Sequence, residues 1–518
     1  MSRRGVVAAG HELTAQAAAR TLAEGGNAFD AALAAMCAAS ATEPVLTSLG
    51  GGGFLLALPA HGPCRVYDFF VHTPLERRPP AELDFHPVTV DFGAVQQAFN
   101  VGHGSIATPG VVKGMFAVHR ELGHMPMREI VAPAIDYARD GVELNALQAY
   151  IFRIVEPIYT WSPAARAIFG SPKDAGRMVG EGETLRQTEL ADLLEVLAIE
   201  GEDLFYRGEV AQTIVEQCRG QGGCLTRHDL EHYRVELREP LEVEYGGVQV
   251  LANPPPSSGG ILIGFALRLL DRIEELREAA FGSHGHLRRV ALALEATAQA
   301  RVDAHIDQST AYPDAAQLLD ENLLERYRVD VRHHARATRG TTHMSIIDAD
   351  DNVAALTVSN GEGCGHIVPG TGVMLNNMLG EEDLNPHGFH RWKPDQRMTS
   401  MMSPSILRWP DGRIVATGSG GSKRIRTALL QVIVNLIDHG MAVAPSVESP
   451  RIFFEDGKLS VEGGFRAEEV DRLLEDYPRH QVWNELNLYF GGAHTVGHGA
   501  SGFYGAGDPR RGGVSIVV

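Results

Sequence analysis

Two β-patterned runs on either side of an acidic turn constrain the fold of this 518-residue chain most strongly. They cover residues 341–347 and 353–359, and the turn between them reads Asp-Ala-Asp-Asp-Asn. Turn residues between two such runs are typical of a β-hairpin, which we expect to be centred on Asp350. In that register Thr341 lies opposite Ser359, with Cβ atoms about 4.5–5.5 Å apart. The hairpin therefore brings two hydroxyl groups together at its open end.

Thr341 is also suited to act as a nucleophile, provided that a base removes its proton. Cleavage directly before Thr341 would free its own α-amine, whose pKa of about 7.7–8.0 suits a base at neutral pH. Gly340 has no side chain to block attack on its carbonyl. An N-to-O acyl shift followed by hydrolysis would leave segments of 340 and 178 residues. From these residues alone, an ordinary strand entry remains an alternative interpretation.

The first sixty residues predict two helices and a strand. A helical pattern ends at Gly25-Gly26, and Asn27 is placed to cap a second, alanine-rich helix with Asp30 in its first turn. Four glycines at 50–53 precede an apolar strand over 54–58. We expect these small-residue helices to pack closely against a sheet.

The middle of the chain, from about residue 110 to 335, is predicted to be largely helical from its 3.6-residue periodicity. One interruption is the run Asn-Pro-Pro-Pro-Ser-Ser-Gly-Gly at 253–260, which we expect to be irregular. The charged segment 325–339 is helix-like and directly precedes the hairpin.

Composition excludes several classes of protein. The 46 Lys and Arg residues against 65 Asp and Glu give a net charge of −19, which disfavours nucleic-acid binding because such a surface repels phosphates. Neither a signal peptide nor a membrane-spanning segment is apparent, which predicts a cytoplasmic protein, or a periplasmic or secreted one if a leader has been removed.

No metal or cofactor is expected from the spacing of potential ligands. The five cysteines form no CxxC pair, which argues against both a disulfide framework and a structural zinc site. His333, His334 and His343 lie near the proposed cleavage point without a recognised ligand spacing, and we predict that they are surface residues.

Short motifs recur along nearly the whole chain in a fixed order, and together they are far more specific than any one alone. The run that begins at Thr341 reads T-T-H-M-S-I-I-D. The other motifs are G-G-N-A-F-D-A-A at 25–32, G-G-G-G-F at 50–54, T-P-G at 108–110, A-R-D-G at 138–141, P-P-P-S-S-G-G at 254–260, L-N-N at 375–377, M-S-P at 402–404, G-S-G-G-S at 418–422 and G-D-P-R at 507–510. This ordered set resembles the γ-glutamyltransferase family, also called γ-glutamyltranspeptidase or glutathione hydrolase.

The resemblance implies an α+β fold, the αββα sandwich of N-terminal-nucleophile hydrolases, in which two stacked β-sheets are flanked by helices. It also implies one folded unit in two segments: 1–340 as the large-subunit segment and 341–518 as the small-subunit segment, which begins with the nucleophile. The two fragments are expected to remain associated after cleavage.

The resemblance further implies roles for individual residues. Cleavage between Gly340 and Thr341 makes Thr341 the nucleophile, and Ser359 matches a second threonine that is hydrogen-bonded to it. Gly420 and Gly421 match the glycine pair whose backbone N–H groups form the oxyanion hole. The implied substrate is a γ-glutamyl amide such as glutathione, the acceptor is water or an amino acid, and no cofactor is implied.

The residues that hold the substrate depart from the family pattern. Glu381 keeps an acid for the substrate amine, whereas Gly361, next to Asn360, and Met378 replace polar residues. For the substrate carboxylate, Ser400 is kept but Met401 replaces a serine, and the family arginine is offered only by Arg77 or Arg78, displaced by one or two positions. Two alternatives therefore remain open: an acylase of the same superfamily that acts on a glutaryl-type or other amide, or an unprocessed, non-catalytic homologue.

Overall fold

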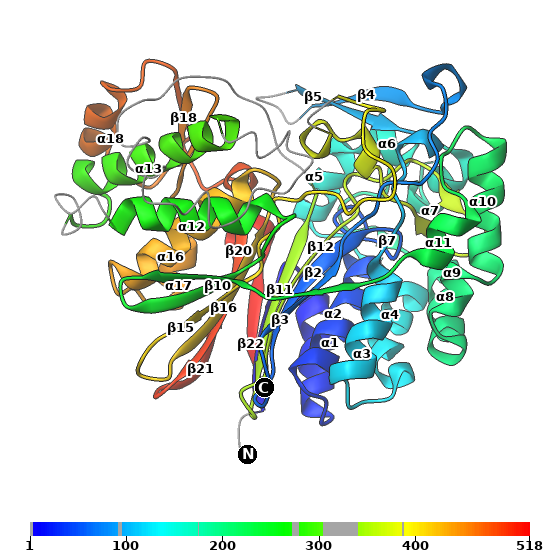
Figure 1. Ribbon diagram of the computed structural model, residues 1–518, viewed down its shortest axis with the longest axis horizontal. Coiled ribbons are helices and arrows are strands. Elements are labelled where there is room, and N and C mark those ends of the chain that lie inside the picture. The colour runs from blue at the N-terminus through cyan, green and yellow to red at the C-terminus, as the bar shows by residue number, and fades with distance from the viewer. Residues whose placement is uncertain (1–3, 92–95, 175, 272–278, 304–339, 386–387) are drawn as a thin grey trace.

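The computed structural model describes residues 4–91, 96–174, 176–271, 279–303, 340–385 and 388–518. Two large β-sheets are stacked on each other, and helices cover both outer faces (Figure 1). This is the four-layer α+β sandwich that the resemblance implies. Strand β11 of the first sheet packs against β16 and β20 of the second, so the start of the hairpin lies between the layers.

The first sheet has seven strands, and all its neighbouring strands are antiparallel. In spatial order they are β22 (Val514–Val517), β1 (Gly5–Ala9), β11 (Thr342–Asp348), β12 (Val353–Ser359), β2 (Gly52–Leu58), β3 (Arg65–Phe69) and β8 (Glu236–Arg238). The central pair, β11 and β12, is the expected hairpin. Its pairing of Thr342 with Val358 and of His343 with Thr357 confirms the predicted register.

The second sheet has six strands, which come from both sides of the Gly340–Thr341 bond. In spatial order they are β21 (Gly502–Ala506), β20 (Gly492–Gly499), β16 (Ile414–Gly420), β15 (Ser405–Arg408), β10 (Val248–Ala252) and β9 (Leu241–Tyr245). Strands β8, β9 and β10 interrupt the region that was predicted to be largely helical. Each has five residues or fewer, which is too short for periodicity to distinguish, and β10 is held by its pairing with the distant β15.

The helices α1 (Glu12–Ala23) and α2 (Ala28–Thr42) lie against the outer face of the first sheet (Figure 1). The predicted cap is confirmed: the Asn27 side chain accepts from the amides of Phe29 and Asp30, and Asp30 accepts from the amide of Asn27. Every residue of α2 is buried, and its many alanines allow it to pack closely between the sheet and the next helices.

The remaining helices extend these two layers. The helices between residues 111 and 232 of the sequence are α3 (Val111–Leu122), α4 (Met127–Asp140), α5 (Ala146–Ile154), α6 (Glu156–Tyr159), α7 (Pro163–Phe169), α8 (Thr188–Glu200), α9 (Asp203–Tyr206), α10 (Glu209–Gly220) and α11 (Arg227–His232). Those on the side of the second sheet are α12 (Ser258–Asp271), α13 (His284–Asp303), α16 (Arg424–Ile437), α17 (Val443–Glu448) and α18 (Ala467–Leu474).

Within the described ranges, nine further strands form small sheets outside the sandwich. They are β4 (His86–Asp91), β5 (Gln96–Val101), β6 (Val142–Glu143), β7 (Thr184–Leu185), β13 (Ile367–Val368), β14 (Val373–Met374), β17 (Ile452–Glu455), β18 (Lys458–Val461) and β19 (His480–Val482). Among the helices of the described ranges, none is long and apolar enough to cross a membrane.

The run at 253–260 was predicted to be irregular throughout, and this was wrong for its last three residues. Helix α12 already begins at Ser258. A Cβ on Gly259 would lie 2.1 Å from the carbonyl oxygen of Met401, so only glycine lets this helix start against a neighbouring backbone. The charged segment 325–339, expected to be helical, lies outside the described residues, as do His333 and His334.

Candidate active site

Thr341 is buried at the open end of the hairpin and lines a pocket between the two sheets. The space among the lining residues, including the part open to solvent, is about 380 Å³. Loops at the ends of several strands contribute to it, together with the first turn of α16. The lining residues are Phe70, Gly340, Thr341, Ser359, Met378, Glu381, Asp383, Leu384, Ser400, Met401, Met402, Ser422 and Ile425.

The carbonyl oxygen of Gly340 is the centre of a compact set of hydrogen bonds. The hydroxyl groups of Thr341 and Ser359 both donate to it, each at 2.7 Å. On the other side of the same residue, the amide of Gly340 donates to Oε1 of Glu362 at 2.9 Å. Both the amide and the carbonyl of Gly340 are thus hydrogen-bonded, and the Thr341 hydroxyl lies directly beside the Gly340–Thr341 peptide bond.

Gly420, the last residue of β16, approaches the backbone of Thr341 from the second sheet. A Cβ at Gly420 would lie 2.1 Å from the Thr341 carbonyl oxygen, closer than real Cβ atoms come to backbone. Gly421 follows with a φ of +116°, in the region that favours glycine. The guanidinium of Arg511 donates to the same Thr341 oxygen at 3.4 Å, so this carbonyl faces both a glycine backbone and a cation.

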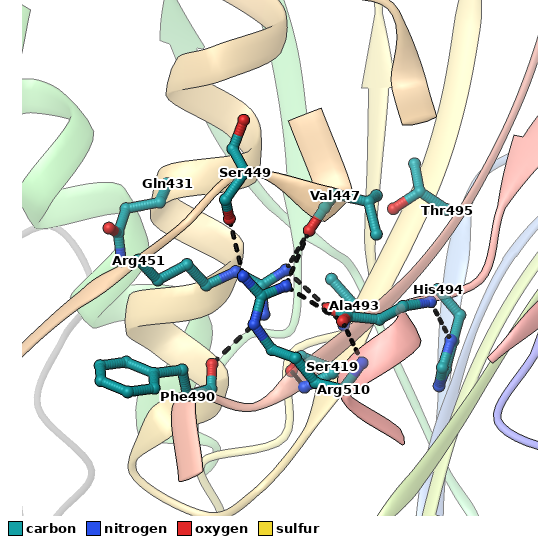
Figure 2. Close-up of polar contacts among 12 residues, drawn as sticks. Ser419, Gln431, Val447, Ser449, Arg451, Phe490, Ala493, His494, Thr495 and Arg510 are labelled. Atoms are coloured by element: carbon teal, nitrogen blue, oxygen red, sulfur yellow. Dashed lines mark hydrogen bonds and ion pairs between the residues drawn. The ribbon is translucent and has the colours of Figure 1, made fainter. Parts of the chain in front are cut away.

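A buried cluster of charges supports the strand that pairs with Gly420. Figure 2 shows Arg451 and Arg510 side by side, with hydrogen bonds to surrounding backbone carbonyls. Asp508 accepts from both guanidinium groups and from the amide of Ala493 in β20. Burial alone would raise the pKa of Asp508, but the two arginines lower it to about 2. The cluster therefore holds the start of β20, where Gly492 pairs with Gly420.

His343 was predicted to be a surface residue, and this was wrong. It is fully buried between the sheets, with Nδ1 2.8 Å from Oγ1 of Thr357 and Nε2 2.8 Å from Oγ of Ser345. Burial, followed by the nearby His494, holds its pKa well below the ordinary value, so the ring is neutral. Side chains along a strand alternate between its two faces, and that of His343 points between the sheets. Its position near the proposed cleavage point does not reveal which face it takes.

Two of the predicted substrate-binding residues, Glu381 and Ser400, line the pocket with Thr341. Glu381 lies close to Gly361, where a Cβ would stand 2.2 Å from its Oε1, so the glycine leaves room for the carboxylate. Asn360 is buried beside them but is not among the lining residues, and its amide donates to the carbonyl of Met374.

Arg77 and Arg78, the two candidates for the substrate carboxylate, are not among the described residues that line the pocket. Arg77 is exposed and lies over the ring of Trp392, 5.2 Å from its centroid. Arg78 donates to the carbonyl of Arg219 at 3.3 Å. Their guanidinium groups are thus engaged outside the pocket.

The sequence did not identify three charged residues at or next to the site. Asp383 lines the pocket, and its place in the acidic run 381–383 could have indicated it. Arg511 directly follows the Gly-Asp-Pro-Arg motif, which gave it no role. Glu362 carries no signal in the sequence, because its contact with Gly340 depends on how the loop after β12 turns back.

Comparison with known proteins gives two kinds of relative. The chain is 31% identical to the glutathione hydrolase proenzyme of Escherichia coli (strain K12), over 98% of this chain and 91% of that protein. It is 30% identical to the acylase ACY 1 proenzyme of Pseudomonas sp. (strain SE83), over 89% of this chain and 84% of that protein. Among solved structures, the cephalosporin acylase from Bacillus halodurans superposes with a TM-score of 0.82 at 25% identity, covering 99% of this chain and 96% of that one.

The family model described as gamma-glutamyltranspeptidase matches residues 14–518. The match includes every residue of the pocket around Thr341 and, of the two large sheets, every strand except β1. The solved structures that share this fold are N-terminal-nucleophile hydrolases. This chain is therefore an enzyme of the gamma-glutamyltranspeptidase family.

Proposed function

We propose that this protein is a self-processing threonine hydrolase or transferase that acts on γ-glutamyl amides such as glutathione. The observation that carries the proposal is the Gly340 carbonyl oxygen, which receives the hydroxyls of both Thr341 and Ser359 at 2.7 Å. Attack by the Thr341 hydroxyl on the Gly340 carbonyl carbon places negative charge on this oxygen. A donor already aimed at it stabilises that charge without reorganisation.

Self-processing then follows in two steps. The Thr341 oxygen forms an ester with the Gly340 carbonyl carbon while the Gly340–Thr341 C–N bond breaks and its nitrogen takes up a proton. Water hydrolyses the ester, which leaves a carboxylate on Gly340 and a free α-amine on Thr341. Glu362 holds the Gly340 amide throughout the first step. Because both large sheets combine strands from 1–340 and 341–518, we expect the two fragments to stay together.

In the mature enzyme, the α-amine of Thr341 acts as the base and its hydroxyl attacks the γ-carbonyl of the substrate. The departing amine takes the proton, and the resulting γ-glutamyl ester on Thr341 is transferred to water or to an amino acid. Gly420 and Gly421 are proposed to supply the backbone N–H groups for the oxyanion. Their support comes from the close approach of Gly420 to Thr341.

Intact-mass spectrometry of the purified protein tests the first part of this proposal. We expect the 56.0 kDa chain to resolve into fragments of 340 and 178 residues, the smaller one beginning with Thr341. Thr341→Ala should stay whole. A wild-type chain that remains uncut would instead support the unprocessed homologue, and a cut at another bond would refute cleavage before Thr341.

The second part of the proposal is the identity of the acyl group. The acidic residues of the pocket support a γ-glutamyl donor. Glu381 and Asp383 both line the pocket, and a carboxylate is the group that pairs with the α-ammonium of a γ-glutamyl group. The identity to a glutathione hydrolase over 98% of this chain adds to this assignment.

A second candidate, an acylase for a glutaryl-type group, is favoured by the apolar side of the same pocket. Met378, Met401 and Met402 line it. Such a surface suits an acyl group that lacks the α-amine. Relatives with both kinds of name match this chain at similar identity.

Parallel turnover of γ-glutamyl-p-nitroanilide and glutaryl-p-nitroanilide separates these candidates. If the donor is γ-glutamyl, Glu381→Gln should lower kcat/KM for it about tenfold to a hundredfold, the value of one charge-assisted hydrogen bond. Turnover of the glutaryl compound should change little. Glu382→Gln is the matched control, since Glu382 is an exposed acid that does not line the pocket. A wild-type preference for the glutaryl compound would favour the acylase.

A further inference from the structure

Three residues far apart in the sequence meet outside the active site. Asp84 precedes β4, His103 begins the short 3-10 helix His103–Ser105, and His366 directly precedes β13. One potential ligand atom from each lies within 4.8 Å of the others. The spacing of histidines in the sequence predicted no metal site because residues 84, 103 and 366 form no local motif.

The distances within this cluster match those between ligands of one metal ion. Oδ2 of Asp84 lies 2.8 Å from Nδ1 of His103 and 3.4 Å from Nε2 of His366. Ligands bound tetrahedrally at 2.0–2.1 Å are about 3.3–3.4 Å apart, so only small shifts are needed to seat an ion. The two imidazole rings lie with centroids 4.0 Å apart. His86 lies at the other oxygen of the same carboxylate, with its Nε2 3.0 Å from Oδ1 of Asp84.

Backbone hydrogen bonds hold the residues of this cluster in place. Oδ2 of Asp84 also accepts from the amide of His103, and the carbonyl of Asp84 accepts from the amide of Gly104. The amide of Gly102 donates to the carbonyl of Cys364 at 2.8 Å, which fixes the two loops that carry the histidines.

The histidines also leave polar atoms without a hydrogen-bond partner. His103 is only 1% exposed, and its Nε2 is buried with no partner among the described residues. Nε2 of His366, the atom nearest Asp84, also makes no hydrogen bond there. Buried polar nitrogens in folded proteins almost always have a partner, and in His103 the nitrogen that lacks one is on the other side of the ring from Nδ1, the atom next to Asp84.

We propose that Asp84, His103 and His366 bind a divalent transition-metal ion, for which zinc is the best match, with His86 or water as fourth ligand. Two imidazoles and a carboxylate are donors that zinc accepts readily in tetrahedral geometry. Each histidine binds the ion through an unprotonated ring nitrogen.

The ion would join the two segments on either side of the Gly340–Thr341 bond. Asp84 and His103 belong to 1–340, and His366 belongs to 341–518. His366 also lies in the loop after β12 that carries Glu362, which holds the amide of Gly340. The ion therefore has a structural role, and it would anchor that loop whether or not the chain is processed.

The test is zinc binding by the full-length protein, prepared without a histidine tag and stripped with a chelator. We expect one tightly bound zinc per chain in a competition titration against a chromophoric chelator. His366→Gln and Asp84→Asn should each weaken it by at least about 100-fold, since even outer-shell partners account for 10–100-fold. The control is His228→Gln, which removes one ring of the exposed pair His228 and His232 on α11, with centroids 3.9 Å apart. That change should leave the tight site unaffected.

Cobalt substitution gives a second readout that does not depend on stability. Co²⁺ in the wild-type protein should show the intense visible absorption of tetrahedral coordination, and this should disappear in His366→Gln while the far-UV circular dichroism is unchanged. Absence of tight zinc in the wild type, or its loss in His228→Gln but not in His366→Gln, would overturn the proposal. So would equal destabilisation by His366→Gln with and without zinc, which would show a hydrogen-bonded cluster only.

Discussion

Gly420→Ala is the sharpest test of how the second sheet positions Thr341, the proposed nucleophile. The added Cβ would lie 2.1 Å from the carbonyl oxygen of Thr341 and 3.0 Å from its carbonyl carbon. These neighbours are backbone atoms, so no flexible side chain can turn away. Restoring an ordinary carbon–oxygen contact requires a shift of about 1 Å in β16 or at Thr341.

A displacement of this size has a predictable cost. Misplacing reacting groups by 1 Å costs about 100-fold in rate, and losing one oxyanion donor costs about 100- to 1,000-fold. We therefore expect kcat of mature Gly420→Ala to fall at least about 100-fold, equivalent to about 2.7 kcal/mol. Overpacking should also lower the free energy of unfolding by about 1–3 kcal/mol.

The assay has three parts for each variant: intact mass over time for processing, turnover of the better p-nitroanilide for catalysis, and the thermal midpoint for folding. Gly220→Ala is the matched control, because nothing lies within 4 Å of a Cβ at that position. If Gly420→Ala matures and turns over like the wild type, Gly420 does not closely approach the reacting centre. A folded variant with normal processing but slow turnover would assign Gly420 to catalysis alone.

Three other predictions follow from the same geometry. Asp508→Asn leaves two buried arginines short of a counter-charge and should lower the free energy of unfolding by about 3–5 kcal/mol, measured by denaturant titration. His494 is fully buried, and burial lowers its pKa to about 4, so its contribution to stability is complete above about pH 6.5 and declines as the pH falls towards 4. His494→Gln should therefore flatten the pH dependence of the unfolding midpoint in that window, and an unchanged slope would contradict this. Glu362→Leu removes the acceptor for the Gly340 amide and should slow self-cleavage about tenfold in time-resolved intact mass, while Glu362→Gln, which keeps an acceptor oxygen, should be close to the wild type. Equal rates for both Glu362 variants would show that this hydrogen bond does not position the bond to be cut.

Local features of the fold were predictable from the sequence because neighbours in the chain decide them. The cap at Asn27 depends on residues within three positions, and it formed as expected. The register of the hairpin depends on the turn around Asp350, and it also formed as expected. The position of Thr341 opposite Ser359 followed from that register, but the sequence did not predict that both hydroxyl groups donate to the Gly340 carbonyl.

The motifs shared with a known family extended the prediction of the fold to nearly the whole chain. They did not show which distant segments contact each other. The strands β9 and β10 were missed because their own residues are too few to show a period, and the second sheet completes their hydrogen bonds. The position of His343 was missed because a strand residue near a cleavage point can face either layer.

The sequence by itself thus determined the hairpin, the cap at Asn27 and the family, and it supplied Thr341 as the proposed nucleophile. Only the tertiary structure showed that Gly420 lies against the backbone of Thr341 and that Asp84 lies close to His103 and His366. It also showed that Arg77 and Arg78 lie outside the pocket. The physical reason is that contacts within a turn or a helix end are set by spacing along the chain. Contacts between loops and stacked sheets are set by packing across hundreds of residues, which no short pattern encodes.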